Sequence, residues 1–226
     1  MKRLLPLILC LLLVACSNKE RIVPTLEEVK TNLAFTCVHE QDHLPKLDAE
    51  ADQLYRYARY LQKNNQLQED VSVFPELERY YRVATAHGHY QVNLELRQMI
   101  GKGQAWTANP MTETLDLTEE LIKQGVPGGY YDMTRYIEAG YGVKQDAELA
   151  LRYYRKSADM GSPEGQYLVG DKLTDIGGQQ SESFKAGLQM WDCASQQGYG
   201  QAGDMLGRNI KGKKCMRRLL RLSILR

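Results

Sequence analysis

Four glycines recur along the chain at an almost constant interval, and this period constrains the fold more than any other feature of the sequence. Gly88, Gly125, Gly161 and Gly198 are 37, 36 and 37 residues apart. A fixed period of about 20–50 residues is the signature of stacked repeats, in which each unit contacts only its neighbours. The spacing therefore predicts an elongated stack of similar units.

The residues before three of these glycines repeat as well. Tyr81, Tyr154 and Trp191 each stand seven residues before a glycine, and small residues occupy the positions four and three before it. Small side chains let successive helices approach closely, whereas the aromatic rings are large enough to fill the layer between repeats. Strand-like alternation is not seen. The sequence therefore predicts an all-α chain, a right-handed α/α solenoid with these three rings inside it.

Start and stop signals locate the expected helices. Those before residue 125 are marked, in order, by the cap Asp48, the start Pro75, the apolar series Val92, Leu96 and Ile100, and the segment 115–124. The first of these helices is expected to break at Asn64-Asn65, and the second to end near Gly88.

The segment from Gly129 to Gly161 is the best-formed unit. A loop built on Gly140 and Gly142 is expected after a short helix, because only glycine takes positive φ freely. Asp146 is a good N-cap for a second helix, and Gly161 is expected to close that helix.

Several residues of this unit form a specific pattern: Tyr136, Gly140, Gly142, Val143, Asp146, Ala150, Tyr154, Ala158 and Gly161. Together they resemble the Sel-one-like repeat, a relative of the tetratricopeptide repeat. The resemblance is strong over 129–161, weaker over 165–198 and weakest over 80–125, and segment 175–183 replaces the Gly-x-Gly-Val loop. It implies an extended helical binding scaffold.

The first residues have the character of an export signal. Lys2 and Arg3 precede an apolar run over 4–14, which at 11 residues is too short to span a bilayer. Leu13-Val14-Ala15-Cys16 resembles the bacterial lipobox, which implies cleavage after residue 15 and lipidation of Cys16. Ser17 follows, and the sorting pattern of that family then favours the outer membrane. The chain is expected to face the periplasm, held there by its lipid.

The pattern divides the chain into four segments. Residues 1–15 are the signal peptide, 16–46 a tether and extended strap, 47–210 the helical repeat solenoid, and 211–226 a basic tail. The tail has two interpretations. It is either a basic amphipathic segment that seeks an anionic surface, or the remnant of a truncated repeat, which is favoured because the break falls inside a repeat.

Charge is distributed unevenly along the chain. The net charge is +1, but two basic residues lie in the signal and seven in the last sixteen residues. The body over 17–210 keeps 20 basic against 28 acidic residues, a net charge of about −8. An acidic body argues against nucleic acid and favours a basic protein partner.

Three cysteines remain in the expected mature chain. Cys37, Cys193 and Cys215 are an odd number without a repeating spacing. In an oxidising compartment they allow one disulfide, but the spacing does not say which pair forms it.

His39 and His43 match the H-E-x-x-H pattern of zinc peptidases. That chemistry needs both imidazoles on one helix face and a third ligand. Pro45 disfavours a helix here, and only His87 and His89 remain as imidazole ligands. The preferred interpretation is a strap whose polar groups pack over the first helices. No catalytic residue, metal site or cofactor is therefore predicted, and the chain is not expected to be an enzyme.

The whole chain resembles repeat lipoproteins that act as immunity proteins. Those are typically encoded beside antibacterial phospholipase effectors of the type VI secretion system. The resemblance implies a secreted effector as partner, gripped without catalysis on the first helices of the repeats. Tyr131, Arg135, Tyr136 and Tyr167 are the expected partner-binding residues.

Two other functions remain open from the sequence. One is an envelope scaffold that assembles cell-wall or signalling proteins. The other is a hydrolase, either a zinc peptidase at His39 and His43 or the penicillin-binding activity associated with some cysteine-rich Sel-one-like proteins. The penicillin-binding alternative is weakened because this chain lacks the paired cysteines within each repeat.

Overall fold

The computed structural model describes residues 23–67, 70–176 and 178–211, and all regular structure in these ranges is helical. The α-helices are α2 (Leu26–Thr31), α3 (Ala49–Asn65), α4 (Phe74–Ala86), α5 (Tyr90–Gly101), α6 (Pro110–Lys123), α7 (Pro127–Ala139), α8 (Ala147–Asp159), α9 (Pro163–Ile176), α10 (Glu182–Gln196) and α11 (Gly200–Lys211). Two short 3-10 helices are η1 (Glu40–Asp42) and η2 (Val71–Val73).

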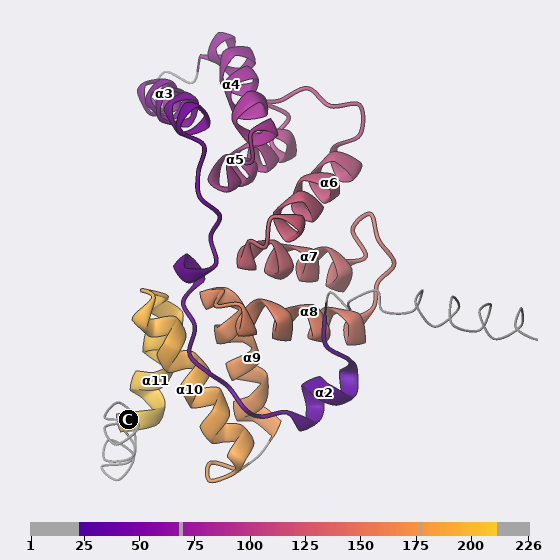
Figure 1. Ribbon diagram of the computed structural model, residues 1–226, viewed down its shortest axis with the longest axis vertical. Coiled ribbons are helices and arrows are strands. Elements are labelled where there is room, and N and C mark those ends of the chain that lie inside the picture. Colours follow the sequence, from indigo (N-terminus) through magenta and orange to yellow (C-terminus); the bar gives the residue numbers. More distant parts are fainter. Residues whose placement is uncertain (1–22, 68–69, 177, 212–226) are drawn as a thin grey trace, which may run out of the picture.

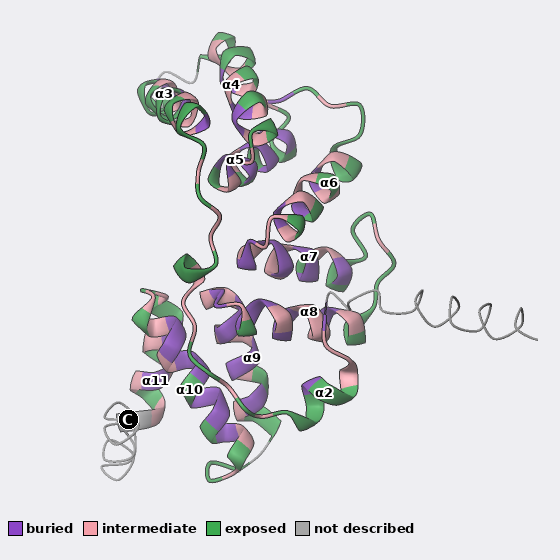
Figure 2. Cartoon of the chain, viewed as in Figure 1, coloured by how far each residue is buried: buried purple, intermediate pink, exposed green. Residues whose placement is uncertain are grey.

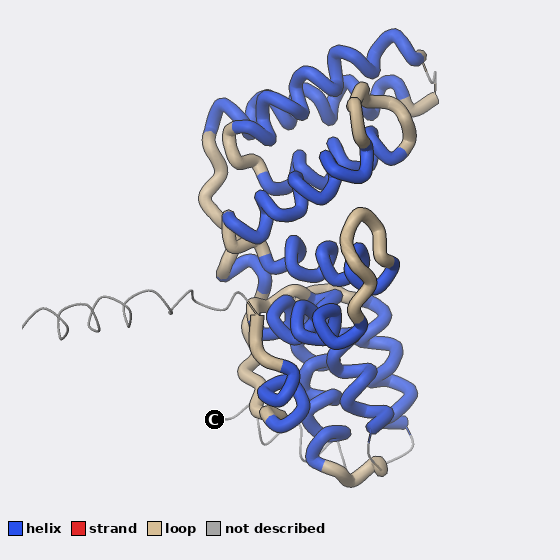
Figure 3. The backbone as a smooth tube through the Cα atoms, turned by 90° about the vertical axis from the view of Figure 1, so that its right-hand side faces the viewer, coloured by secondary structure: helices blue, strands red, loops and turns tan. Residues whose placement is uncertain are grey.

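Helices α3 to α11 form one continuous stack (Figure 1). Each packs mainly on the helix before it and the helix after it in the chain. The view at right angles shows the same succession of helices along the long axis (Figure 3). Contacts limited to neighbours are what distinguishes a solenoid from a globular helical bundle. The predicted all-α fold, an α/α solenoid, is confirmed.

The three repeated aromatic residues occupy the interior, as predicted. Tyr81, Tyr154 and Trp191 have exposed fractions of 0%, 4% and 1%. Figure 2 shows the buried residues along the faces that neighbouring helices turn toward each other. The small residues Ala84 and Ala158 are fully buried, because helices meet at these positions.

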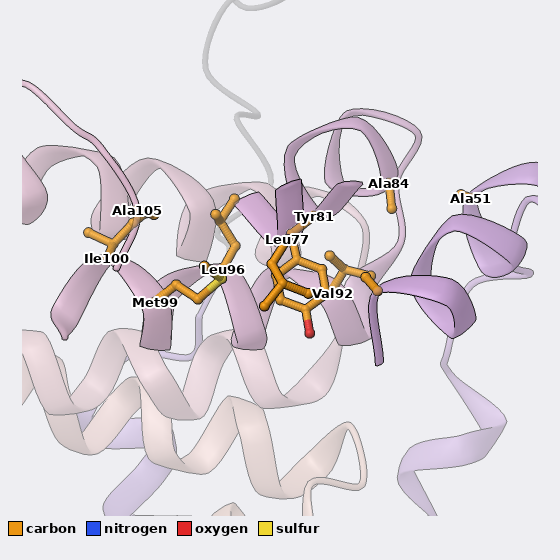
Figure 4. Close-up of a cluster of buried hydrophobic side chains, with 10 residues drawn as sticks. Ala51, Leu77, Tyr81, Ala84, Val92, Leu96, Met99, Ile100 and Ala105 are labelled. Atoms are coloured by element: carbon orange, nitrogen blue, oxygen red, sulfur yellow. The ribbon is translucent and has the colours of Figure 1, made fainter. Parts of the chain in front are cut away.

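The first helices share one apolar cluster. Leu77 and Tyr81 from α4 pack with Val92, Leu96 and Ile100 from α5 (Figure 4). Ala51 and Ala58 supply the α3 side of the same cluster. Burial of large apolar side chains at helical spacing stabilises this end of the stack through the hydrophobic effect.

Most predicted helix boundaries are confirmed. The Asp48 carboxylate accepts a hydrogen bond from the Ala51 N–H, and the Asp146 carboxylate accepts one from the Leu149 N–H, each at 2.9 Å. Gly140 closes α7 with a φ of 68°, a conformation that favours glycine.

The start of α6 differs from the prediction. The helix begins at Pro110, five residues before the predicted start at residue 115. The reason is local, because the Asn109 side chain accepts a hydrogen bond from the Thr112 N–H at 3.1 Å and proline suits the first helical position. In the unit without the glycine loop, Ser181 caps α10 in the same manner.

Residues 23–46 form a strap that crosses the stack. The strap contains α2 and η1, with extended chain between them, so it is less extended than predicted. Its capping box at Thr25 and Glu28 explains α2. The strap runs beside α8 and α10 before it reaches α3 (Figure 1). The expectation that it packs over the first helices is therefore wrong.

Side chains of the second half hold the strap through its backbone. Arg155, which is only 4% exposed, donates from Nη1 to the Asn32 carbonyl at 2.6 Å and from Nη2 to the Ala34 carbonyl at 2.7 Å. Gln166 donates to the Val38 carbonyl at 2.8 Å. Extended chain leaves its carbonyls unpaired, and these donors satisfy them.

A disulfide joins the strap to α10. Cys37 and Cys193 are bonded with a Cα–Cα distance of 5.6 Å, and they are 156 residues apart in sequence. Nearby, a Cβ on Gly161 would lie 2.7 Å from the His39 carbonyl carbon, so only glycine lets the strap pass this closely.

Some predictions concern residues outside the described ranges. These are the signal peptide 1–15, the lipidation site Cys16, the tail from 212 onward and Cys215. Within the described part of the chain, no helix has both the length and the apolar character needed to cross a bilayer.

Candidate functional site

Two adjoining cavities lie on one side of the stack, along α3, α5 and α7. The first, of about 750 Å³, lies between α5 and α7 and is called here the tyrosine pocket. The second, of about 600 Å³, lies between α3, α4 and α5 and is called the polar pocket. Gln98 of α5 lines both, so the two cavities adjoin at this residue, and together they are called the groove.

Aromatic rings dominate the tyrosine pocket. Four tyrosines line it: Tyr131, Tyr136, Tyr141 and Tyr154. Their rings are paired, since Tyr136 stacks on Tyr141 with centroids 5.5 Å apart and Tyr131 lies 6.2 Å from Tyr154. Such paired rings are stiff, amphipathic surfaces that lose little conformational entropy on binding.

The geometry of α7 explains how the pocket forms. Tyr131, Arg135 and Glu138 stand at i, i+4 and i+7, which places them on one face of the helix. The Tyr154 hydroxyl, from α8, donates to the Glu138 carboxylate at 2.7 Å. Burial, together with this bond and the negative charge of Glu138, raises the pKa of Tyr154. The hydroxyl therefore stays protonated and keeps Glu138 engaged.

A buried arginine ties α5 to α7 beneath the pocket. Arg97 is 8% exposed, and its Nη2 lies 2.6 Å from the Asp132 carboxylate. Its Nε also donates to the Asn93 side chain at 2.9 Å. Burial disfavours the charged form, but Asp132 outweighs that effect and the pKa of Arg97 is raised. Arg97 and Asp132 thus neutralise each other.

Arg135 differs from Arg97. Its side chain is exposed at the pocket, and no hydrogen bond or ion pair from the described residues engages its guanidinium. Arginine presents its donors as a planar fork that fits a carboxylate.

The polar pocket is lined by paired charges. Arg59 of α3 lies 2.7 Å from Glu95 of α5, which links the walls across the groove. Behind them the Tyr81 hydroxyl donates to Gln62 at 3.3 Å. Burial raises the pKa of Tyr81, so this hydroxyl remains a donor.

The structure brings three of the four predicted partner-binding residues together. Tyr131, Arg135 and Tyr136 all line the tyrosine pocket. Tyr167 lies elsewhere, with its ring 6.5 Å from Trp191 and 5.3 Å from Tyr199. Their role in binding stays a prediction.

Sequence reasoning missed two large side chains of this pocket. Leu94 is 47% exposed and Tyr141 is 39% exposed, although both are apolar or aromatic. Leu94 interrupts the polar side of a helix, and Tyr141 stands between two loop glycines. An apolar residue on a polar helix face and an aromatic residue in a glycine loop were the sequence signals that could have identified them.

The H-E-x-x-H segment does not form a catalytic helix. His39 has extended backbone angles, and the residues after it form only the three-residue η1. The Glu40 carboxylate instead accepts a hydrogen bond from the Gly128 N–H, at the start of α7, at 3.1 Å. The Sγ atoms of Cys37 and Cys193 lie within 4.8 Å of a His39 nitrogen. Both sulfurs are in the disulfide, so neither is a thiolate ligand.

Comparisons with known proteins identify similar folds. No family model matches the sequence, and the comparison with curated proteins gives no match. The crystal structure of the immunity protein Pa5087 from Pseudomonas aeruginosa is 32% identical, with a TM-score of 0.60, covering 77% of this chain and 64% of that one. The immunity protein PA5088 from the same organism is 31% identical, with a TM-score of 0.57, covering 74% of this chain and 60% of that one.

Two further structures are similar. The Pseudomonas aeruginosa protein PA5086 is 32% identical with a TM-score of 0.60, covering 78% of this chain and 64% of that one. A Sel1 repeat protein from Oxalobacter formigenes is 19% identical with a TM-score of 0.54, covering 70% of this chain and 62% of that one, and it shows the fold alone. The chain thus spans about 64% of the length of the first Pseudomonas structures.

The class of protein follows from the fold and these comparisons. The chain is an α/α helical solenoid, similar in fold to a Sel1 repeat protein. It is similar to immunity proteins of Pseudomonas aeruginosa, so the resemblance inferred from its repeat residues is confirmed.

Proposed function

We propose that this chain is an immunity protein that binds an antibacterial effector and neutralises it. The observation that carries the proposal is the identity of 32% to the immunity protein Pa5087 over 77% of this chain. The solenoid fold supports it, because such stacks present long continuous surfaces to protein partners.

The proposed mechanism is occlusion rather than catalysis. The groove is preformed, since the ion pairs Arg59–Glu95 and Arg97–Asp132 already fix its walls. A preformed surface loses little conformational entropy on binding. The effector's active surface is covered when the groove grips it, and no bond in either protein is made or broken.

The finer proposal names the effector and the place. The effector is a secreted phospholipase of the type VI system, and the immunity protein waits for it in the periplasm. The lipobox at Cys16 supports a lipid anchor in the outer membrane. Tethering raises the local concentration of the immunity protein where the enzyme would attack phospholipid.

Co-expression tests the proposal directly. The genes beside that of this chain are searched for a secreted lipase, which is then exported to the periplasm of a sensitive bacterium, with and without this chain. We expect lysis with the lipase alone and survival when both are present. A catalytically inactive lipase is the toxicity control. Continued lysis despite detectable immunity protein would overturn the proposal and leave the envelope scaffold as the better interpretation.

The anchor needs a separate experiment. Labelled palmitate should enter the wild-type chain but not Cys16→Ser, and fractionation should move the variant out of the outer membrane. Equal labelling of both would contradict the anchor while leaving immunity intact.

A further inference from the structure

The tyrosine pocket carries a more specific inference, which rests on the proposed function. We infer that it receives an acidic side chain of the partner, bound by Arg135, together with an adjacent apolar or aromatic side chain. The partner segment is thus a protrusion in which Asp or Glu stands next to a large apolar residue.

The charge inventory of the pocket selects a carboxylate. Its charged lining residues are Arg97, Asp132, Arg135 and Glu138. Arg97 and Asp132 are paired at 2.6 Å, and Glu138 already accepts from Tyr154. Within the described chain no hydrogen bond or ion pair engages the exposed guanidinium of Arg135, so its donors face solvent and are open to a partner. A carboxylate that meets this fork forms a charge-assisted, bidentate contact.

The walls of the pocket select the apolar neighbour. Leu94 and Tyr141, which line the same pocket as Arg135, are 47% and 39% exposed. An apolar side chain placed between them is removed from water together with these walls. Binding hot spots are enriched in tyrosine and arginine within desolvated pockets, and both residue types line this pocket.

A basic side chain fits this pocket less well, although tyrosine rings attract cations. The ammonium of Lys172 lies 5.7 Å from the Tyr154 ring centroid, so that face already has a cation. An incoming cation would also lie close to Arg135. The acidic body of the chain, about −8 over 17–210, acts at longer range and guides the encounter rather than the local contact.

Peptide selection tests the pocket without the effector. A phage library of random 12-residue peptides is selected on the wild-type chain and on Arg135→Glu. We expect wild-type selection to enrich Asp or Glu next to a large apolar residue. The enrichment of these peptides should be at least tenfold lower on Arg135→Glu than on the wild type. A peptide with its acidic residue changed to Lys should regain binding to Arg135→Glu. Enrichment without an acidic preference, or no enrichment, would overturn the inference.

Two control variants make the outcome specific. Arg79→Glu makes the same charge reversal on α4, at an exposed residue outside both cavities, and should bind the selected peptides as the wild type does. Leu94→Ser should weaken binding while leaving Arg135 intact. Equal losses for Arg79→Glu and Arg135→Glu would show a general charge effect and contradict the inference.

The co-expression assay separates this inference from the proposed function. If Arg135→Glu protects cells as well as the wild type does, the pocket inference fails and immunity stands. If the wild type fails to protect but still selects acidic peptides through Arg135, the proposed function fails and the pocket chemistry stands.

Discussion

The two halves of the solenoid are stabilised in different ways. Helices α3 to α6 have an apolar cluster centred on α4 and α5 (Figure 4), and the strap reaches this half only at its end, where Pro45 and Lys46 line a cavity with His87. Helices α7 to α11 have several smaller clusters, and the strap and its disulfide cross them from outside. The comparison teaches that one repeat fold can be held together by its own packing or by a distant segment of the same chain.

The largest effect is expected from equivalent core truncations in the two halves. Tyr81→Ala and Trp191→Ala each remove a buried ring at the same repeat position, and each should cost about 3–5 kcal/mol of unfolding free energy. Trp191→Ala also removes the hydrogen bond from its indole N–H to the Tyr167 carbonyl. Urea unfolding measures both.

Hydrogen exchange then shows whether the halves are coupled. Tyr81→Ala should expose amides of α4 and α5 first, and Trp191→Ala those of α9 and α10. If both variants expose the whole chain equally, the solenoid unfolds as one unit and the contrast between halves disappears.

The disulfide is the next largest difference between the halves. The double variant Cys37→Ser, Cys193→Ser should lose about 2–5 kcal/mol of unfolding free energy, because the disulfide closes a long loop. Faster amide exchange is expected in the strap and in α8 to α10. Reduction of the wild type should reproduce the effect, and unchanged exchange in α10 would contradict it.

Arg155 tests the strap without changing the sulfur chemistry. Arg155→Ala leaves two strap carbonyls without their donor, which should lower the free energy of unfolding by about 2–3 kcal/mol. Arg56→Ala breaks an exposed ion pair with Asp52 and should cost less than about 1 kcal/mol. If Arg155→Ala and Arg56→Ala lose the same stability in thermal unfolding, the bonds from Arg155 do not stabilise the strap.

The smallest predicted effect depends on pH. Burial first, and then the negative charge of Glu164, raise the pKa of Glu40 to about 7 from 4.5. Because the folded-state pKa is the higher one, folding is penalised as pH rises from 4.5 through 7, and no penalty remains below 4.5. The strap should therefore be least stable above pH 7.

Glu40→Gln should remove this penalty while keeping an oxygen acceptor for the Gly128 N–H. We expect the variant to be more stable than the wild type by about 1–2 kcal/mol at pH 8, after allowance for partial exposure, and equal to it near pH 4. Exposed Glu119→Gln is the control. A pH-independent difference between Glu40→Gln and the wild type would contradict the prediction.

Much of the fold could be predicted because its signals are local. The period of the glycines, the caps at Asp48 and Asp146 and the interior positions of Tyr81 and Trp191 all follow from short-range geometry. The early start of α6 was missed because the helix was placed only over the segment 115–124, whereas Asn109 caps it and Pro110 starts it.

The route of the strap could not be predicted from the sequence. Its partners are backbone carbonyls, which carry no residue identity, and donors such as Arg155 and Gln166 look like ordinary helix residues. The same limit left the pairing of Cys37 and Cys193 open. In the candidate site, helical spacing placed Tyr131 and Arg135 together, but only the fold shows which charges in the pocket are already paired.

The bond between the strap and α10 has a consequence for the order of assembly. Residue 37 leaves the ribosome long before residue 193, since 156 positions separate them. The early repeats pack only on their neighbours in the chain, whereas the strap cannot reach its final position until α8 to α10 are present. The first-made segment of the described chain is therefore among the last to reach its final position.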